Sequence, residues 1–245
     1  LDAIPAEAEV HADALRLRGL LALAAGRPAE AAARLAEAVL ARPDQPGLHR
    51  DHARALRAAG QHAEAEGVLR DAVARWPHDP DLAFMAAMAA HDRGDEAGAM
   101  KGMQQILQRT PRHPGALNYI GFAWAEEGVR LREAEAMLRL ALQQRPEDPA
   151  ITDSLGWVLY RQGRLAEAEQ AVRAALAGSP GEPEVLFHLA AVLRAAGKAA
   201  EAKAALEAAL KHSPDAKARR LWQVRWRRLE QAPKPPQAPP APPPE

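Results

Sequence analysis

A glycine that returns about every 34 residues constrains this chain more than any other feature of its sequence. An alanine follows each glycine after five residues, and a proline follows after seventeen; both offsets are one longer in the fourth repeat. The glycines are Gly26, Gly60, Gly94, Gly128, Gly163 and Gly197. Columns that stay in register over six repeats indicate a repeated unit of two helices and a turn, because ~34 residues is the length of such a unit.

Each column has a physical reason. Glycine takes the left-handed conformation that ends a helix, alanine lets two helices approach closely, and proline ends the second helix. Apolar residues recur between the columns at helical spacing, as at Ile151, Leu155 and Val158. One unit cannot bury such a face alone, so we expect an all-α solenoid of stacked units. The predicted segments are a lead-in at 1–11, repeats at 12–45, 46–79, 80–113, 114–148, 149–182 and 183–216, a capping helix at 217–230 and a proline-rich tail at 231–245.

Charge and composition exclude several classes of protein. Lys and Arg (32) balance Asp and Glu (32), so the chain lacks the overall positive charge of a nucleic-acid binder. Without cysteine it has no disulfide, no thiolate zinc site and no cysteine nucleophile. No apolar run approaches the ~20 residues that cross a bilayer. Because the first residue is Leu1, we expect a processed form or a piece of a longer protein.

The fifth repeat carries the clearest family resemblance. From Asp148 to Pro180 it reads DPAITDSLGWVLYRQGRLAEAEQAVRAALAGSP, which resembles the tetratricopeptide repeat family in its small, apolar, glycine, aromatic and proline columns. The resemblance covers nearly the whole chain and implies a right-handed α-solenoid that binds proteins without catalysis. His49 and Ala83 depart from it, because they stand where the family favours a large residue. We therefore expect looser packing in the second and third repeats.

The fourth to sixth repeats carry a narrower resemblance. The extra residue after Gly128 and the string from Asp153 to Trp157 are similar to bacterial repeat proteins that include outer-membrane lipoprotein adaptors of periplasmic carboxyl-terminal processing proteases. This implies an envelope adaptor, periplasmic or attached to the outer membrane, that holds a protease and its substrates together. This sequence has no lipidated amino-terminal cysteine. The alternatives are a cytoplasmic assembly or chaperone-like scaffold, and the repeat arm of a larger enzyme.

Candidate catalytic and metal-binding pairs are weak. Asp153 and Ser154 are adjacent, but adjacent helical residues do not face one another, and no G-x-S-x-G turn holds the serine. Gly197-Lys198 lacks the rest of a phosphate-binding loop. His49 and His52 are half of a metal site without its other ligands. We therefore expect no enzymatic activity, no cofactor and no bound metal.

The resemblance places chosen columns of each first helix on a concave groove, where repeat proteins bind their partners. All three phenylalanines, with Trp157 and Tyr160, fall on these columns, which predicts an apolar stripe for a protein or peptide partner. The alternative is that these rings complete the core. Trp124 and Tyr119 fall on packing columns and are predicted to be core. The predicted groove residues are Phe84, Met88, Asn118, Phe122, Asp153, Trp157, Tyr160, Arg161, Phe187 and Arg194, with His91, Asp92 and Glu126 on the same columns.

A basic ridge is predicted on the second repeat. Arg50, Arg54 and Arg57 are spaced i, i+4, i+7, and no acidic residue occupies the same columns of that helix. Such a ridge is either a solvated helix face or a surface for a carboxylate-rich segment.

The residues after the sixth repeat form two further segments. Trp222, Trp226 and Leu229 line one side of an amphipathic helix, which we interpret as a cap on the last repeat. An anionic membrane surface is the alternative partner for its arginines and tryptophans. Prolines alternate through 231–245 and favour extended polyproline II, as in a linker or a ligand of a proline-reading domain.

Overall fold

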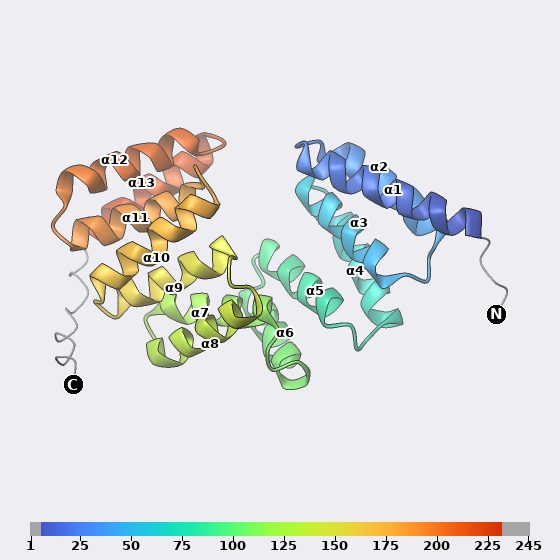
Figure 1. The fold of residues 1–245 in the computed structure, drawn as a ribbon, viewed down its shortest axis with the longest axis horizontal. Helices are drawn as coiled ribbons and strands as arrows, with labels where there is room; N and C mark the ends of the chain where they lie inside the picture. The colour runs from blue at the N-terminus through green and yellow to red at the C-terminus, as the bar shows by residue number, and fades with distance from the viewer. Residues whose placement is uncertain (1–5, 232–245) are drawn as a thin grey trace. The chain divides into compact units, whose positions relative to one another are not determined.

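A computed structural model describes residues 6–231 of the chain. Over this range the protein contains thirteen helices and no strand, which confirms the all-α repeat solenoid (Figure 1). These described residues form two compact lobes divided after Pro111, an N-terminal lobe within 1–111 and a C-terminal lobe within 112–245. No described helix is long and apolar enough to cross a membrane. Most of the predicted proline-rich tail, 232–245, lies outside the described residues.

The N-terminal lobe contains three helical hairpins. In each, the first helix packs against the second, and within the lobe the second helix of the first two hairpins packs against the first helix of the hairpin that follows. The helices are α1 (Ala6–Ala24), α2 (Pro28–Ala41), α3 (Pro46–Ala58), α4 (His62–Arg75), α5 (Pro80–Asp92) and α6 (Glu96–Arg109). Helix α1 begins at Ala6, ahead of the predicted repeat boundary, so part of the predicted lead-in is helical.

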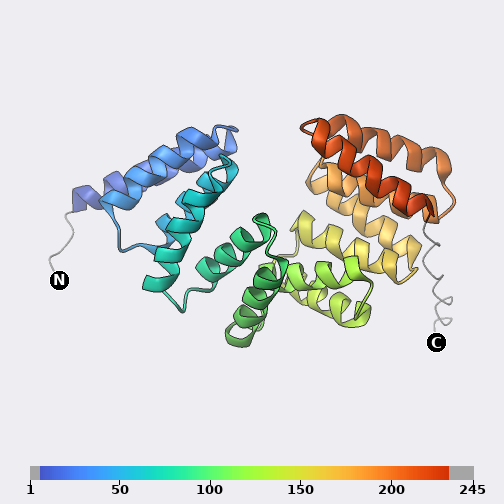
Figure 2. The same cartoon turned by 180° about the vertical axis from the view of Figure 1, so that it is seen from behind.

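The C-terminal lobe contains three more hairpins and a final single helix. That last helix packs against both helices of the sixth hairpin, and Figure 2 shows it in red beside them. The helices are α7 (Pro114–Glu127), α8 (Leu131–Gln144), α9 (Pro149–Arg161), α10 (Leu165–Gly178), α11 (Pro183–Ala195), α12 (Ala199–His212) and α13 (Ala216–Gln231).

The turn inside each hairpin depends on the periodic glycine. The six glycines of the column have φ angles between +70° and +84°, which confirms the left-handed conformation expected for them. Proline then occupies the first turn of six helices, where its missing N–H has no partner to lose. Asp79 and Asp148 cap α5 and α9 by accepting hydrogen bonds from backbone N–H groups of the first turn.

A column of small residues sets how closely the two helices of a hairpin approach. A Cβ atom added at Gly19 would lie 2.6 Å from Leu35 Cγ, and one added at Gly156 would lie 2.5 Å from Val172 Cγ2. Ala53, Ala87 and Ala190 occupy the same column in other repeats. The backbone of the first helix therefore lies against side chains of the second helix, and this close contact fixes the geometry of the hairpin.

Two series of polar contacts repeat along the stack. In the N-terminal lobe, Arg75 Nη1 donates to Pro43 O (2.8 Å), and Arg109 Nη1 donates to Pro77 O (3.0 Å). In the C-terminal lobe, Glu135 on α8 pairs with Arg164 (2.8 Å) at the next turn. One repeat later, Glu169 pairs with Lys198 at 2.9 Å. Each contact joins one hairpin to the next at the same repeat position.

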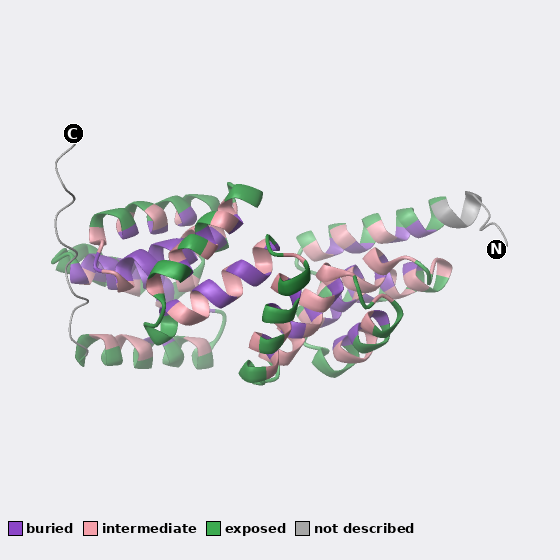
Figure 3. Ribbon diagram, turned by 90° about the horizontal axis from the view of Figure 1, so that it is seen from below, coloured by how far each residue is buried: buried purple, intermediate pink, exposed green. Residues whose placement is uncertain are grey.

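The two lobes differ in how completely their first helices are buried. Every residue of α9 from Asp153 to Tyr160 is buried, and so is every residue of α11 from Val185 to Leu193. No first helix of the N-terminal lobe carries such a run among its described residues. Figure 3 shows the buried residues of the C-terminal lobe concentrated in its central helices. A helix buried on all sides has no free face, so the inner surface of this lobe is largely enclosed.

Candidate functional site

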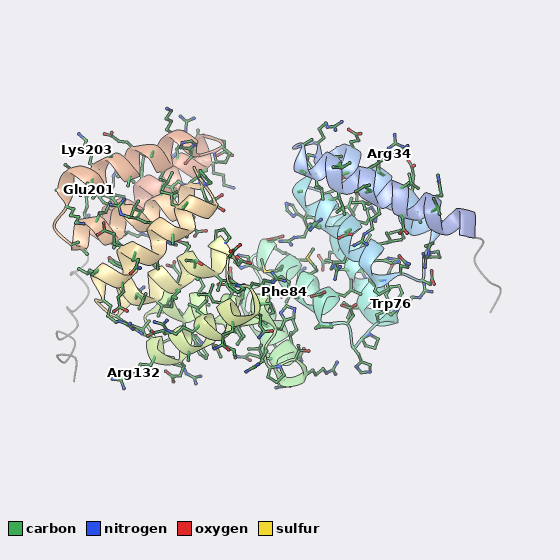
Figure 4. All side chains as sticks on the ribbon, viewed as in Figure 1. Arg34, Trp76, Phe84, Arg132, Glu201 and Lys203 are labelled. Atoms are coloured by element: carbon green, nitrogen blue, oxygen red, sulfur yellow. The ribbon has the colours of Figure 1, made fainter. Side chains whose placement is uncertain are left out.

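First helices of successive repeats contact one another within each lobe: α1 with α3, α3 with α5, α7 with α9, and α9 with α11. Long side chains such as Arg34, Arg132 and Lys203 project from the second helices into solvent (Figure 4). The series of first helices is therefore the inner surface on which the groove was predicted.

In the N-terminal lobe, two of the predicted groove residues lie on α5. Phe84 and Met88 are both half-buried, and Figure 4 labels Phe84 on this helix. Met85, next to Phe84, is buried and packs with Leu69 and Leu82 in the core of the lobe. Phe84 and Met88 are thus partly accessible side chains at the edge of a packed core.

The predicted basic ridge is neutralised by acidic residues. Arg50 pairs with Asp81 at 2.5 Å, and Arg57 pairs with Asp92 at 2.6 Å; both acids lie on the next first helix, α5. Arg54 lies 3.9 Å from the carboxylate of Asp51 on its own helix. No acidic residue occupies the same columns of α3, as the sequence indicated, but the structure supplies acidic partners from other positions: Asp51 on α3 itself, and Asp81 and Asp92 on the next first helix.

In the C-terminal lobe, the first helices enclose an ion pair. Asp153 on α9 and His188 on α11 lie 2.7 Å apart, between Oδ2 and Nδ1. The His188 side chain is fully buried, and that of Asp153 is 8% exposed. A buried charge is stable only when it is paired, so each of these residues depends on the other.

Aromatic rings surround this pair. Trp157 stacks on His188 with ring centroids 4.3 Å apart, and on Tyr160 at 4.8 Å. Phe122 on α7 lies 6.0 Å from the same histidine ring. We call Asn118, Phe122, Asp153, Trp157 and His188 the inner cluster.

The ionisation of His188 reflects two opposing effects. Burial lowers the pKa of this imidazole, because the interior disfavours charge. The charge of Asp153, its hydrogen bond and the more distant Glu184 raise the pKa and prevail, so the pKa of His188 lies above its ordinary value. Burial likewise raises the pKa of the Tyr160 hydroxyl, against the positive charges of Arg194 and Arg161.

Several buried polar atoms of the inner cluster have no hydrogen-bond partner within the described residues. They are Asn118 Oδ1, Asp153 Oδ1, Trp157 Nε1 and His188 Nε2. Asn118 and Asp153 occupy the same column on neighbouring first helices. Buried polar atoms are nearly always paired in folded proteins, and each unpaired one costs ~1–3 kcal/mol. The inner cluster thus combines donors and acceptors that are ready for additional partners.

Helix α13 closes one side of this surface. Trp222 packs on Phe187 of α11 with ring centroids 5.1 Å apart, and Trp226 meets the same ring edge-on at 6.4 Å. Arg225 reaches from α13 to Glu126 on α7 (3.1 Å) and to Glu184 on α11 (3.6 Å). The final helix is therefore tied to the first helices on either side of α9.

The half-buried groove residues of this lobe, two of them members of the inner cluster, form a partly accessible rim. Asn118, Phe122, Arg161 and Arg194 are half-buried. Arg161 Nη1 donates to Glu126 O (2.7 Å), and Arg194 Nη2 donates to Glu230 O (3.1 Å). These four side chains lie at the edges of the inner cluster and of α13.

The structure corrects the predicted exposure of the aromatic stripe. Trp157 and Tyr160 are each 4% exposed, and Phe187 is 1% exposed, so these rings are enclosed and do not line an open groove. Trp124, predicted as core, is instead half-buried beneath the guanidinium of Arg130, which lies 4.2 Å from its ring centroid. Tyr119 is also half-buried. Whether the enclosed rings take part in binding stays a prediction.

Sequence reasoning missed two functional candidates, His188 and Arg225. His188 lies 35 residues after Asp153, one repeat plus one position. Arg16 and Asp51 in the first two repeats have the same separation and a bond of 2.7 Å. A search for oppositely charged residues separated by 35 positions, one more than the repeat, would have found both the Asp153–His188 and the Arg16–Asp51 pair. No comparable signal marks Arg225, since its contact with Glu126 spans 99 residues.

The pairs considered for catalysis have ordinary structural roles. Ser154 Oγ donates to Ala150 O (2.9 Å) within its own helix. The His49 ring is 2.9 Å from Pro43 O and packs on Trp76 at 5.1 Å. Burial, with the neighbouring His49, lowers the pKa of His52. Among residues 6–231 no group of three or more His, Asp or Glu side chains is arranged to hold a metal ion.

Comparison with known sequences identifies the class. One tetratricopeptide repeat model matches residues 22–73 and 159–223, and a second matches 50–114 and 129–183. Together they cover most of the chain and every turn glycine except Gly128. With the helical hairpins and their left-handed turns, these matches show that the chain belongs to the tetratricopeptide repeat family.

Solved structures with the same fold include three that span most of the chain. The Cut9–Hcn1 hetero-tetramer of the APC/C matches with a TM-score of 0.73 and 18% identity, over 86% of this chain and 42% of that one. PilF of Pseudomonas aeruginosa matches with a TM-score of 0.63 and 15% identity, over 89% of this chain and 99% of that one. TTC0263 of Thermus thermophilus matches with a TM-score of 0.58 and 21% identity, over 77% of this chain and 100% of that one. Such low identities show the shared fold alone.

A curated relative matches over a short segment. The TPR repeat-containing protein PA4667 of Pseudomonas aeruginosa is 45% identical over 49 residues, which is 20% of this chain and 8% of the relative. The chain thus spans less than a tenth of the length of this relative, and under half of the Cut9–Hcn1 chain that it matches.

Proposed function

We propose that this protein is a non-catalytic scaffold that holds a polypeptide partner against the inner surface of its C-terminal lobe. The family and the fold support a protein-binding role, because stacked helical hairpins form extended surfaces on which repeat proteins bind their partners. The inner cluster supports this location.

The observation that carries the proposal is the set of unpaired buried atoms in the inner cluster. Trp157 Nε1 is a donor, Asn118 Oδ1 and Asp153 Oδ1 are acceptors, and His188 Nε2 completes the set. The backbone of a polypeptide carries both N–H donors and C=O acceptors, and its apolar side chains can pack on the surrounding aromatic rings. A partner of this chemistry would satisfy atoms that have no hydrogen-bond partner among residues 6–231.

The partner enters from the half-buried rim. Asn118 and Phe122 are the accessible members of the inner cluster. Arg225, Glu126 and Glu184 form partly exposed ion pairs at its edge. Such pairs contribute only ~0–1 kcal/mol each, so a partner can replace them at little cost.

Site-specific photo-crosslinking tests the proposal. A photoreactive amino acid at Phe122 is expected to crosslink a polypeptide in extracts of the source cell, and mass spectrometry then identifies the crosslinked peptide. Ala174, exposed on the outer surface of α10 in the same lobe, is the matched control. Crosslinks of equal yield at Phe122 and Ala174, or none at Phe122, would refute binding at the inner surface.

The finer role follows from the resemblance of the fourth to sixth repeats. We propose that the partner is a bacterial envelope protease together with its substrates, and that the scaffold presents the substrates. The 45% identity to a TPR repeat-containing protein of Pseudomonas aeruginosa is consistent with a bacterial repeat protein of this kind. A cytoplasmic assembly scaffold and the repeat arm of an enzyme are the alternatives.

The crosslinked partner and the gene decide between these roles. If the protein is such an adaptor, the photoreactive amino acid at Phe122 should crosslink a protease and its substrates. The gene should then encode a lipid-attachment cysteine ahead of this sequence. A cytoplasmic partner captured instead would favour the assembly scaffold. A catalytic domain encoded in the same gene would favour the enzyme arm.

A further inference from the structure

The last helix of the C-terminal lobe is strongly basic on its outward side. Helix α13 has six Lys and Arg side chains and a single acid, Glu230, in a chain whose total charge is balanced. Arg225 is turned inward to Glu126 and Glu184, and Glu230 accepts a hydrogen bond from Trp226 Nε1 (2.8 Å). Figure 2 shows α13 in red, in front of the helices on which it packs.

Six exposed residues form a continuous line along this outward side. They are spaced i, i+3, i+4, i+7, i+10 and i+11, which places them on one face of the helix. The four cations among them make no ion pair within residues 6–231, and Leu221 (54% exposed) and Val224 (38% exposed) lie between them. We call this set the α13 stripe: Lys217, Arg220, Leu221, Val224, Arg227 and Arg228.

The repeat register indicates that the α13 stripe is not the seat of a further helix. Arg220 and Arg227 occupy the columns of Leu15 and Ala22 on α1, which pack against the second helix of their own hairpin. In the six hairpins these two columns contain no lysine, arginine or acidic residue. An arginine buried against a helix would hold its charge away from water without a partner. The two arginines therefore suit a charged or aqueous neighbour.

The sequence after α13 does not continue the repeat either. Gln231 stands where the turn glycine would fall, and Pro236 stands where the alanine of the second helix would fall. Eight prolines occupy positions 233–244, which is the stretch that a second helix would need. Proline inside a helix removes a backbone hydrogen bond and clashes with the preceding turn. The open side of α13 thus follows from residues that the sequence contains.

The chemistry of the stripe fits a lipid bilayer better than other anionic partners. Lys and Arg bind negative headgroups, while exposed apolar side chains such as Leu221 and Val224 reach the boundary of the acyl chains. The backbone of a nucleic acid offers charge but no apolar partner. A peptide commonly binds in a groove or at a sheet edge, whereas one outward helix is convex.

We propose that the α13 stripe docks on the surface of an anionic phospholipid bilayer, with the helix parallel to that surface. The tryptophans of the helix are not used, because Trp222 is 8% exposed and packs on Phe187. This activity goes beyond the proposed binding of a polypeptide, since the stripe is on the side of α13 opposite to its contact with the inner surface. Either activity can fail without the other.

Co-sedimentation of the full chain with vesicles tests the docking. The unaltered chain is expected to sediment with phosphatidylcholine vesicles that contain about 30% phosphatidylglycerol, and not with phosphatidylcholine alone. Added salt should release it, because exposed charges are screened. Arg220→Gln combined with Arg227→Gln should weaken binding to the anionic vesicles at least about tenfold, because each cation near the surface contributes to the attraction.

A second double variant separates the position of the charges from their number. Arg70→Gln combined with Arg132→Gln removes the same charge from exposed arginines on α4 and α8, and should bind the vesicles as the unaltered chain does. Circular dichroism checks that both double variants stay folded. Equal binding by the two double variants would overturn the proposal. So would an unaltered chain that ignores anionic vesicles, or one that binds a DNA duplex or polyglutamate in their place.

A fluorescent label tests which side of α13 meets the bilayer, since the chain has no cysteine of its own. Leu221→Cys is labelled with a dye whose emission shifts to the blue in an apolar environment. The shift is expected on addition of anionic vesicles, and the same dye at Ala174→Cys, exposed on α10, should not respond. No shift at position 221, or equal shifts at both positions, would overturn docking through the stripe.

Discussion

Trp157 and Trp124 lie in neighbouring repeats, and their surroundings are the reverse of what their columns indicated. Trp157 is enclosed by Tyr160 and His188, whereas Trp124 lies half-exposed beneath Arg130. Trp157→Ala should therefore reduce the free energy of unfolding by roughly 3–5 kcal/mol, as for other buried rings. Trp124→Ala should reduce it by about 1–2 kcal/mol, the loss of partial burial and of a cation–π contact.

Urea denaturation of the two variants measures the difference. Trp157→Phe, which keeps an aromatic ring in the cluster, serves as the conservative control and should recover much of the lost stability. If Trp124→Ala proved as destabilising as Trp157→Ala, the assignment of only Trp157 to the core would be wrong.

The ion pair of Asp153 and His188 should make stability depend on pH. The pKa of His188 is raised in the folded protein, whereas the unfolded value is about 6.5. The folded state therefore binds the proton more tightly, so the stabilisation is complete below about pH 6.5 and is lost as the pH rises through the higher folded pKa. The slope cannot exceed about 1.4 kcal/mol per pH unit for one group.

Chemical denaturation between pH 5.5 and 9 measures this slope. His188→Gln should flatten it, and His62→Gln, at an exposed histidine on α4, should leave it unchanged. An unchanged slope in His188→Gln would show that this ion pair does not control the pH dependence.

At the scale of single residues, the sequence indicated which residue types occupy which repeat columns, but not which side chains contact one another. The repeat placed Asn118, Asp153 and Trp157 on inner helices, and they lie there. It did not reveal that Asp153 meets His188, because that contact joins different columns of different helices. Nor did it reveal that Arg50 and Arg57 are neutralised, because their acidic partners on α5 come from the following repeat.

At the scale of the helical hairpin, the small column predicts a steric test. A Cβ at Gly156 would lie 2.5 Å from Val172 Cγ2 and 3.2 Å from the Val172 backbone nitrogen. Gly156→Ala should therefore destabilise the protein by about 1–3 kcal/mol, despite the better helix propensity of alanine. Gly156→Ala combined with Val172→Ala should be less destabilised than the sum of the two single changes, because the added methyl gains room.

Thermal melts of the two single variants and the double variant complete this cycle. Strict additivity would show that the methyl group added by Gly156→Ala does not meet Val172, and that the hairpin is less closely packed at this column than the structure indicates.

Helix α13 allows a second test at this scale. Trp222 is 8% exposed and packs on Phe187, whereas its neighbour Leu221 is 54% exposed. Trp222→Ala should cost roughly 3 kcal/mol and Leu221→Ala under about 0.5 kcal/mol. Unchanged stability of Trp222→Ala, together with loss of binding to anionic vesicles, would favour the membrane surface as the partner of the tryptophan side of this helix.

At the scale of the whole molecule, the period of the sequence was enough to predict the fold. Six glycines with positive φ and a small residue facing each second helix determine a hairpin, and repetition determines a stack. The enclosure of the C-terminal inner surface could not be predicted in this way. It arises from contacts among α7, α9, α11 and α13. The Arg225–Glu126 pair among them does not follow the repeat spacing of the sequence.

The central claim is that a polypeptide binds the inner cluster of the C-terminal lobe, and a titration tests it most directly. The peptide identified by crosslinking at Phe122 is titrated by calorimetry into the unaltered chain, Phe122→Ala and the outer-surface control Ala174→Ser. Because rings at the centre of an interface contribute most of its affinity, Phe122→Ala should weaken binding by about 2 kcal/mol, roughly thirtyfold, while Ala174→Ser has no effect. Equal affinity for all three proteins, with folding intact, would contradict the claim.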